Sequence, residues 1–122
     1  MEKIRSYQDL IVWQKSMLLV EIIYKATQCF PKHELYGLTN QVRRAAVSVP
    51  SNIAEGQARQ STAEFRNFIS IAQGSKAEVE TQIMIAHRLN YINKTNMNLI
   101  LSLCTEISKM LGSLKQKLEI NK

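Results

Sequence analysis

The sequence has few of the residues that interrupt regular secondary structure or build cross-linked frameworks. Its 122 residues include 4 glycines, 2 prolines, 2 cysteines and 1 tryptophan. So few glycines and prolines argue against disorder and against a turn-rich fold, while 45% hydrophobic residues are enough for a compact core. Cys29 and Cys104 are too few for a disulfide scaffold and lack metal-ligand spacing. We predict two partly buried thiols in a reducing cytoplasm.

Motifs for catalysis and cofactor binding are also missing. The chain has no glycine-rich phosphate loop, no nucleophile elbow and no paired-histidine zinc helix. His33 and His87 lie far apart, and neither belongs to the Glu-x-x-His motif that di-iron helical bundles need. We therefore predict a protein that is not an enzyme and that uses no metal, cofactor or small-molecule substrate.

Long apolar runs are absent as well. The most apolar stretch, residues 10–24, is interrupted by Gln14, Lys15 and Glu21, and no small-residue cleavage site follows it. We predict neither a membrane span nor export, and hence a cytoplasmic protein without a membrane partner.

Helical periodicity is what the chain does have, and no segment shows sustained strand alternation. Apolar residues recur at steps of three and four over residues 7–29, 32–57, 61–89 and 95–118. Short connections between four such segments predict an all-α fold, an antiparallel up-down-up-down four-helix bundle, in one domain over residues 1–122. Gly56 should end the second helix in a left-handed conformation. Ser61 and Glu64 form a predicted capping box at the start of the third.

The first segment is apolar around more of its circumference than one core requires. We expect its core line to consist of Leu10, Trp13, Met17, Val20 and Tyr24. A second apolar line of Val12, Leu19 and Ile23 runs beside it. This surplus predicts a subunit interface or contact with a protein partner.

The second segment places a dense polar stripe next to its apolar face, with Pro50 inside the helix as a predicted kink. The stripe consists of Gln41, Arg44, Ser48, Asn52 and Glu55. One interpretation is a paired polar network at a subunit interface, since buried polar groups need partners.

The charge balance favours an anionic partner. Sixteen Lys plus Arg against ten acidic residues give a net charge of +6 and a pI near 9.5. Five of the arginines lie in the two middle segments: Arg43, Arg44, Arg59, Arg66 and Arg88. Arginine suits planar phosphate contacts, so these five are candidate nucleic-acid contacts, and Arg43, Arg59 and Arg66 are expected to face solvent. A basic surface that is merely solvated stays an open alternative.

A family resemblance rests mainly on residues 41–56, which read Gln-Val-Arg-Arg-Ala-Ala-Val-Ser-Val-Pro-Ser-Asn-Ile-Ala-Glu-Gly. Three shorter motifs support it: Tyr7-x-Asp9-Leu10, Phe30-Pro31 followed by Tyr36-Gly37, and Gly74-Ser75. Residues 7–92 resemble the bacterial four-helix-bundle proteins encoded in intervening sequences of 23S ribosomal RNA genes. The resemblance implies a homopentamer. A relative of that family, the accessory variability determinant of diversity-generating retroelements, works with a structured RNA and a reverse transcriptase. Val49 stands where the family more often has isoleucine.

These features together predict a non-catalytic, oligomeric four-helix-bundle protein that binds structured RNA through a basic surface. The alternative is a protein-interaction scaffold that recruits a nucleic-acid enzyme such as a reverse transcriptase. The exposed apolar surface predicted for the first helix would serve either function.

Overall fold

The computed structural model describes residues 6–120. Four α-helices make up most of this range: α1 (Ile11–Thr27), α2 (Leu38–Ala58), α3 (Thr62–Arg88) and α4 (Lys94–Ile120). Two short 3₁₀ turns, η1 (Tyr7–Asp9) and η2 (Lys32–Glu34), precede α1 and α2. Residues 6–120 contain no strand, so the all-α prediction is confirmed.

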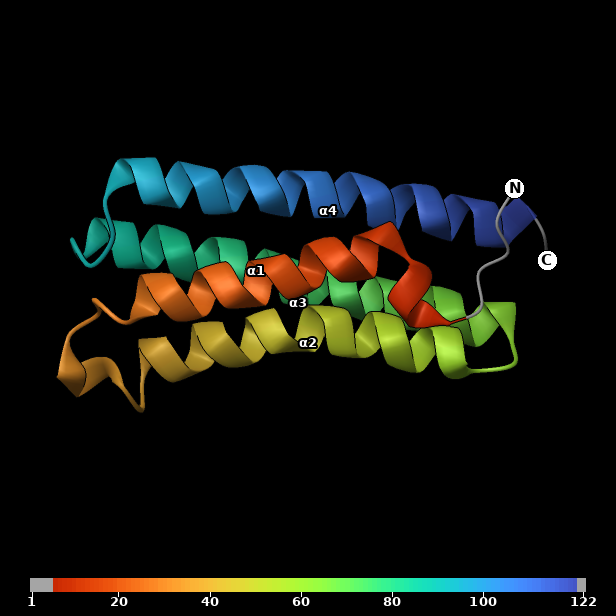
Figure 1. The fold of residues 1–122 in the computed structure, drawn as a ribbon, viewed down its shortest axis with the longest axis horizontal. Coiled ribbons are helices and arrows are strands. Elements are labelled where there is room, and N and C mark those ends of the chain that lie inside the picture. Colours follow the sequence, from red (N-terminus) through yellow and green to blue (C-terminus); the bar gives the residue numbers. More distant parts are fainter. Residues whose placement is uncertain (1–5, 121–122) are drawn as a thin grey trace.

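The helices lie alongside one another, and successive helices run in opposite directions (Figure 1). Each helix packs against two neighbours, since α1 contacts α2 and α4, and α3 contacts the same two helices. The α1–α2 and α3–α4 connections lie at one end of the molecule, which we call the paired-loop end. The α2–α3 connection lies at the opposite end, together with the start of α1 and the end of α4, and we call this the terminal end.

A single core runs between the four helices. Every helix contributes side chains with less than 2% exposure, and these have the helical spacing that the sequence shows. The largest of these side chains are Leu19, Ile23, Val42, Val49, Ile53, Ile69, Val79, Ile83, Ile100, Cys104, Ile107 and Leu111. Helical spacing predicts inner lines on the third and fourth helices, and most of their members are buried: Ala72, Ser75, Val79, Ile83 and Ala86 on α3, and Ile100, Cys104, Ile107 and Leu111 on α4. The other members of these predicted lines, Phe65, Phe68, Met97, Leu114 and Leu118, are half-buried.

The predicted core line of the first helix is wrong. Its buried residues are Val12, Ser16, Leu19, Ile23 and Thr27. On the predicted line, Trp13 is half-buried, and Met17 and Tyr24 remain 41% and 42% exposed. Both lines have helical spacing, and only the packing of α1 between α2 and α4 selects one of them. The predicted apolar surplus on this helix is confirmed.

Gly56 does not end α2 in a left-handed conformation. No described glycine has a positive φ, and α2 continues to Ala58. Gly56 is buried, and a Cβ there would lie 2.6 Å from Phe68 Cβ and 3.0 Å from Phe65 Cδ1. The glycine therefore allows α2 and α3 to approach closely, which a sequence pattern alone does not distinguish from a cap.

The helix ends are closed by side chains and one left-handed residue. Ser61 Oγ accepts a 3.3 Å hydrogen bond from the backbone N–H of Glu64, which confirms Ser61 as the N-cap of α3. Asn93 Oδ1 accepts a 2.8 Å hydrogen bond from the backbone N–H of Asn96, in the first turn of α4. Asn90, with φ of 64°, terminates α3, and the Tyr91 N–H then donates to Ala86 O at 2.8 Å.

Candidate nucleic-acid interface

The two connections at the paired-loop end are joined by one carboxylate. Glu34 Oε1 accepts a 3.1 Å hydrogen bond from the backbone N–H of Leu38, in the first turn of α2. Its Oε2 accepts one from Tyr91 Oη at 2.9 Å, and the Tyr91 ring packs 5.6 Å from Phe30. These bonds hold residues 32–38 against the α3–α4 connection.

The same hydrogen bonds determine the charge state of Glu34. The Leu38 N–H, then the Tyr91 hydroxyl, hold the pKa of the carboxyl below its usual value of 4.5, with a smaller contribution from His33. The bond to Glu34 raises the pKa of Tyr91 above 10.0. At neutral pH this carboxylate is charged, and each of its two oxygens accepts a hydrogen bond.

The paired-loop end carries most of the net charge of the chain. It comprises residues 25–44 and 85–96, which bring six Lys or Arg together with Glu34 as the only acidic residue. Six cations against one carboxylate give this end a charge of +5, compared with +6 for the whole chain. We call the six residues the basic pole: Lys25, Lys32, Arg43, Arg44, Arg88 and Lys94.

The cations of the basic pole are available to an external anion. Five of the six are exposed, and none of the six takes part in an ion pair within the described residues. The exception in exposure is Arg43, which is half-buried. Its Nε donates to Thr27 Oγ1 at 2.8 Å, and its guanidinium lies 4.7 Å from the ring centre of Tyr24. Arg43 therefore ties α2 to α1 while its charge stays at the pole.

The other two candidate arginines lie at the terminal end. Arg59 pairs with Glu55 at 3.2 Å and with Glu64 at 3.9 Å, and its guanidinium covers the ring of Phe68 at 5.1 Å. Arg66 is half-buried, and its Nη1 is inaccessible and without a hydrogen-bond partner. Of the three arginines expected to face solvent, Arg59 is exposed, whereas Arg43 and Arg66 are half-buried. Arg43 and Arg59 are 16 residues apart, which is about 24 Å along a helix.

The predicted polar stripe of α2 divides into three parts. Ser48 and Asn52 form a network with Ser75 of α3: the two serine hydroxyls are 2.8 Å apart, and Asn52 Nδ2 donates to Ser48 Oγ at 2.8 Å. Glu55 pairs with Arg59, as predicted for an i, i+4 pair. The rest of the stripe, Gln41 and Arg44, is exposed and lines a pocket of about 460 Å³ together with Ser48, Glu78 and Gln82. The hydrogen-bond network of Ser48, Asn52 and Ser75 therefore joins α2 and α3 within one chain.

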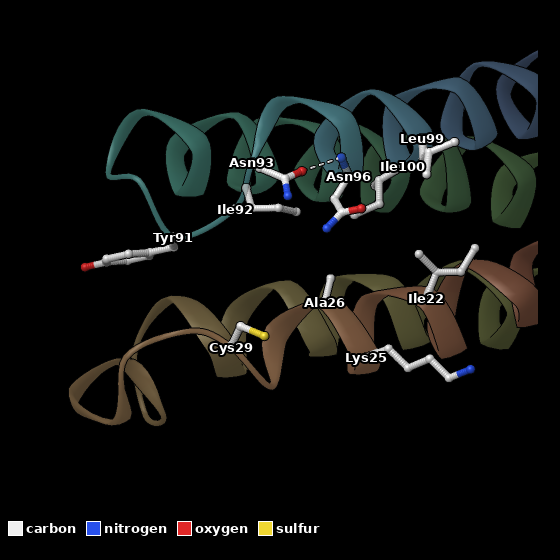
Figure 2. A pocket seen from close by; sticks show the side chains of 10 residues that line it. All are labelled: Ile22, Lys25, Ala26, Cys29, Tyr91, Ile92, Asn93, Asn96, Leu99 and Ile100. Carbon is white, nitrogen blue, oxygen red and sulfur yellow. Dashed lines mark hydrogen bonds between the residues drawn. The ribbon is translucent and has the colours of Figure 1, made fainter.

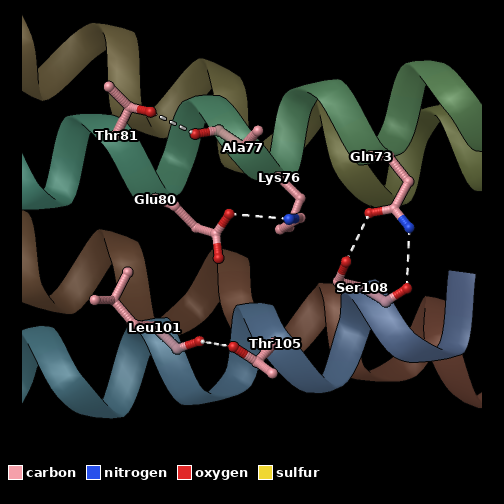
Figure 3. Close-up of polar contacts among 8 residues, drawn as sticks. All are labelled: Gln73, Lys76, Ala77, Glu80, Thr81, Leu101, Thr105 and Ser108. Atoms are coloured by element: carbon pink, nitrogen blue, oxygen red, sulfur yellow. Dashed lines mark hydrogen bonds and ion pairs between the residues drawn. The ribbon is translucent and has the colours of Figure 1, made fainter. Parts of the chain in front are cut away.

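The α3–α4 seam is held by a second set of polar contacts (Figure 3). Gln73 Nε2 donates to Ser108 O at 2.9 Å, and Ser108 Oγ is 3.1 Å from Gln73 Oε1. Lys76 and Glu80 form a 2.9 Å ion pair in which both side chains are at least three-quarters buried. Burial, reinforced by Glu80, raises the pKa of the Cys104 thiol to about 12. These groups are paired inside the fold and offer nothing to a ligand.

The seam between α1 and α4 near the paired-loop end is open and largely apolar (Figure 2). A pocket of about 360 Å³ lies between Ile22, Lys25 and Ala26 of α1 and Leu99 and Ile100 of α4. Leu99 is 63% exposed, and Cys29 at the pocket edge is exposed, unlike the partly buried thiol predicted. Among the described residues, no group of three His, Cys, Asp or Glu side chains could hold a metal ion.

Three of the five arginines that the sequence offers as nucleic-acid contacts lie at the paired-loop end. Arg43, Arg44 and Arg88 belong to the basic pole, and Arg59 and Arg66 do not. The lysines of the pole were missed because only the arginines were counted as a group. The charge balance of residues 25–44 and 85–96 would have revealed them, provided that the two connections were known to share one end.

Comparisons with known proteins agree with this fold. Residues 8–113 match the family model described as 23S rRNA-intervening sequence protein. The chain belongs to this family. A crystal structure from the S23 ribosomal protein family of Bacteroides thetaiotaomicron VPI-5482, described as a protein with unknown function, is 28% identical and has a TM-score of 0.78. The match covers 87% of this chain and 96% of that one. Among curated proteins, none matches the chain.

Family membership extends the resemblance seen in the sequence, which covered residues 7–92, into α4. The match to the intervening-sequence protein family ends at residue 113, within the last two turns of that helix. The whole basic pole lies inside the matched range. Within residues 6–120, no helix is both long enough and apolar enough to cross a membrane.

Proposed function

We propose that this intervening-sequence protein binds structured RNA through the basic pole, without catalysis. The observation that carries the proposal is the charge asymmetry: residues 25–44 and 85–96, at one end of the bundle, hold six cations without an ion pair among the described residues and one carboxylate, Glu34, whose two oxygens both accept hydrogen bonds. Glu78, next to this end, lines a pocket with Arg44. Cations that lie within about 10 Å of one another reinforce the local potential at physiological salt, and phosphates are the anions that best use several of them at once.

The family description supports RNA as the anion. It links these proteins to intervening sequences of 23S rRNA. Structured RNA presents closely spaced phosphates on a compact surface, and its recognition relies on shape and backbone contacts. An acidic protein partner would also match the positive charge of the pole. The RNA-binding experiment distinguishes an RNA partner from a protein partner.

Fluorescence anisotropy with a labelled RNA hairpin tests the proposal. The variant Arg44→Gln with Arg88→Gln removes two exposed charges from the pole. We expect weaker binding and a slope of log K against log salt that is shallower by about 1.4 to 1.8, since each lost phosphate contact contributes about 0.7 to 0.9.

The charge-matched control is Lys109→Gln with Lys117→Gln, which removes two exposed charges from α4 toward the terminal end. It should leave the slope unchanged. Equal losses in both double variants would mean that only net charge matters, and no binding of RNA at low salt by the wild type would refute the proposal.

We also propose that the chain assembles into a homo-oligomer, with the pentamer implied by the family resemblance as the expected state. Large apolar side chains stay more than 40% exposed on three helices, among them Ile11 and Leu18 of α1, Ile85 of α3 and Leu99 of α4. Exposed apolar area of this kind is a reason for self-association or for docking of a protein partner. A ring of subunits would repeat the basic pole and add avidity to weak single contacts.

A further inference from the structure

Tyr36 differs from every other tyrosine in the chain because its ring touches almost nothing. Tyr7 packs on Trp13 with ring centres 5.3 Å apart, and Tyr91 packs on Phe30. Tyr24 lies under the guanidinium of Arg43. Tyr36 is 91% exposed, the highest value among the large hydrophobic residues of the described chain. Its ring therefore contributes almost no burial energy to the fold.

The backbone that carries Tyr36 is nevertheless well ordered by hydrogen bonds. The N–H of Leu35 donates to Lys32 O at 3.1 Å, and that of Gly37 donates to Glu34 O at 2.9 Å. Glu34 is itself fixed by Leu38 and by Tyr91. An exposed ring on an ordered turn loses little backbone entropy when a flat ligand stacks on it.

The surroundings of Tyr36 favour a nucleotide as that ligand. Lys32 and His33 precede it in the same turn, where both are exposed, and His33 has 73% side-chain exposure. Arg44 follows two turns into α2. An exposed aromatic ring flanked by cations is the arrangement with which proteins hold unpaired bases, because the ring stacks on the base and the cations hold the adjoining phosphates.

We propose that Tyr36 stacks on an unpaired base of the bound RNA, so that the paired-loop end selects RNA with an unpaired loop or bulge over continuous duplex. This inference rests on the proposed RNA-binding function and adds to it a substrate class and a specificity-determining residue. The same pole of a second copy is a poor occupant of this surface, since both poles carry a charge of +5.

The test uses two labelled RNAs, a hairpin with an unpaired loop and a blunt duplex with the sequence of its stem. Tyr36→Ala should lower the affinity for the hairpin about 5-fold to 150-fold, since stacking on one base contributes about 1 to 3 kcal/mol. Its affinity for the duplex should change less than about 2-fold. Tyr36→Phe keeps the ring and should bind both RNAs like the wild type, whereas Tyr36→Leu should behave like the alanine variant.

The matched control is Leu35→Ala, which shortens the exposed neighbour of Tyr36 in the same turn without touching an aromatic ring. It should leave the binding of both RNAs unchanged. Light scattering on each variant then shows whether assembly is altered.

Three results would overturn the inference. They are an unchanged hairpin affinity in Tyr36→Ala, an equal loss for hairpin and duplex, and a change of oligomeric mass in that variant, which would place the ring at a subunit or protein interface. If Arg44→Gln with Arg88→Gln weakens binding while Tyr36→Ala does not, RNA binding stands and base stacking fails. If the wild type binds neither RNA, both proposals fail.

Discussion

Gly56 and Gly112 lie in the interiors of helices and are indistinguishable by propensity, but their surroundings differ. A Cβ on Gly56 would meet Phe68 Cβ at 2.6 Å, whereas one on Gly112 would have no atom within 4 Å. Phe68 Cβ is attached directly to the backbone of α3, so it cannot move unless the helix moves. The same substitution should therefore have opposite effects at the two positions.

We predict that Gly56→Ala destabilises the protein by about 1 to 3 kcal/mol, because the clash exceeds the gain in helix propensity. Gly112→Ala should stabilise it by up to about 1 kcal/mol, since only the propensity term applies. Urea unfolding followed by circular dichroism measures both. A stabilised Gly56→Ala variant would contradict the close approach of α2 and α3.

The two cysteines differ in burial and should differ in reactivity. Cys104 is fully buried, and burial raises its pKa to about 12, so its thiolate is scarce at neutral pH. Cys29 is exposed. We predict that a thiol reagent labels one cysteine per native chain and two per chain in denaturant. Cys29→Ser should abolish the native labelling, and rapid labelling of that variant would show that Cys104 is accessible.

At the scale of elements, the paired-loop end depends on one carboxylate that joins two connections. Glu34 caps the first turn of α2 and accepts the Tyr91 hydroxyl from the α3–α4 connection. Close approach of Gly37 is part of this arrangement, since a Cβ there would lie 2.7 Å from Glu34 Oε1. The anchor is electrostatic and therefore depends on pH.

The pKa of Glu34 is lowered in the folded state from its ordinary value of 4.5. Below that value the unfolded chain binds the proton more readily than the folded chain does, so stability is present above pH 4.5 and declines as the pH falls toward the lowered pKa. We predict that Glu34→Gln reduces stability at neutral pH and reduces the further loss on acidification. The control Glu119→Gln, at an exposed position of α4, should keep the wild-type pH dependence, as measured by urea unfolding at several pH values.

At the scale of the whole molecule, charge and apolar surface are distributed unevenly. The basic pole occupies one end, while exposed apolar side chains lie on all four helices and also at that end, where Leu35, Tyr36 and Leu89 are exposed. A ring of subunits that repeats the basic pole needs subunit contacts along the sides of the helices.

We predict that Leu99→Lys lowers the mass of the oligomer measured by light scattering, because it places a charge on the most exposed apolar side chain of α4. Asn98→Lys adds the same charge at the adjacent exposed position and should leave the mass unchanged. Both variants should unfold like the wild type. A monomeric wild type at micromolar concentration would argue against assembly.

RNA binding should also leave a footprint confined to one end of the molecule. We predict that amide hydrogen exchange slows in residues 25–44 and 85–96 when RNA is added, and stays unchanged in residues 55–70 at the terminal end. Protection spread evenly over both ends would indicate non-specific attraction to a basic protein.

Helical periodicity predicted four helices, the N-cap at Ser61 and the inner lines of α3 and α4, because these depend on neighbours in sequence. It misjudged α1, where two apolar lines have the same spacing, and Gly56, where a cap and a close contact have the same composition. The sequence pattern also grouped Arg43 with Arg59, although 16 residues of helix separate them by about 24 Å along the helix axis.

The sequence by itself determined the helical segments, the net positive charge, the family and the surplus of apolar residues on α1, since each of these depends on composition or on local spacing. The tertiary structure alone decided that residues 25–44 and 85–96 meet at one end, that Arg59 is neutralised while Arg44 and Arg88 are not, and that Tyr36 stays exposed. Antiparallel packing brings every second connection together, and only that packing places charges that are 44 to 69 residues apart in the sequence on one surface.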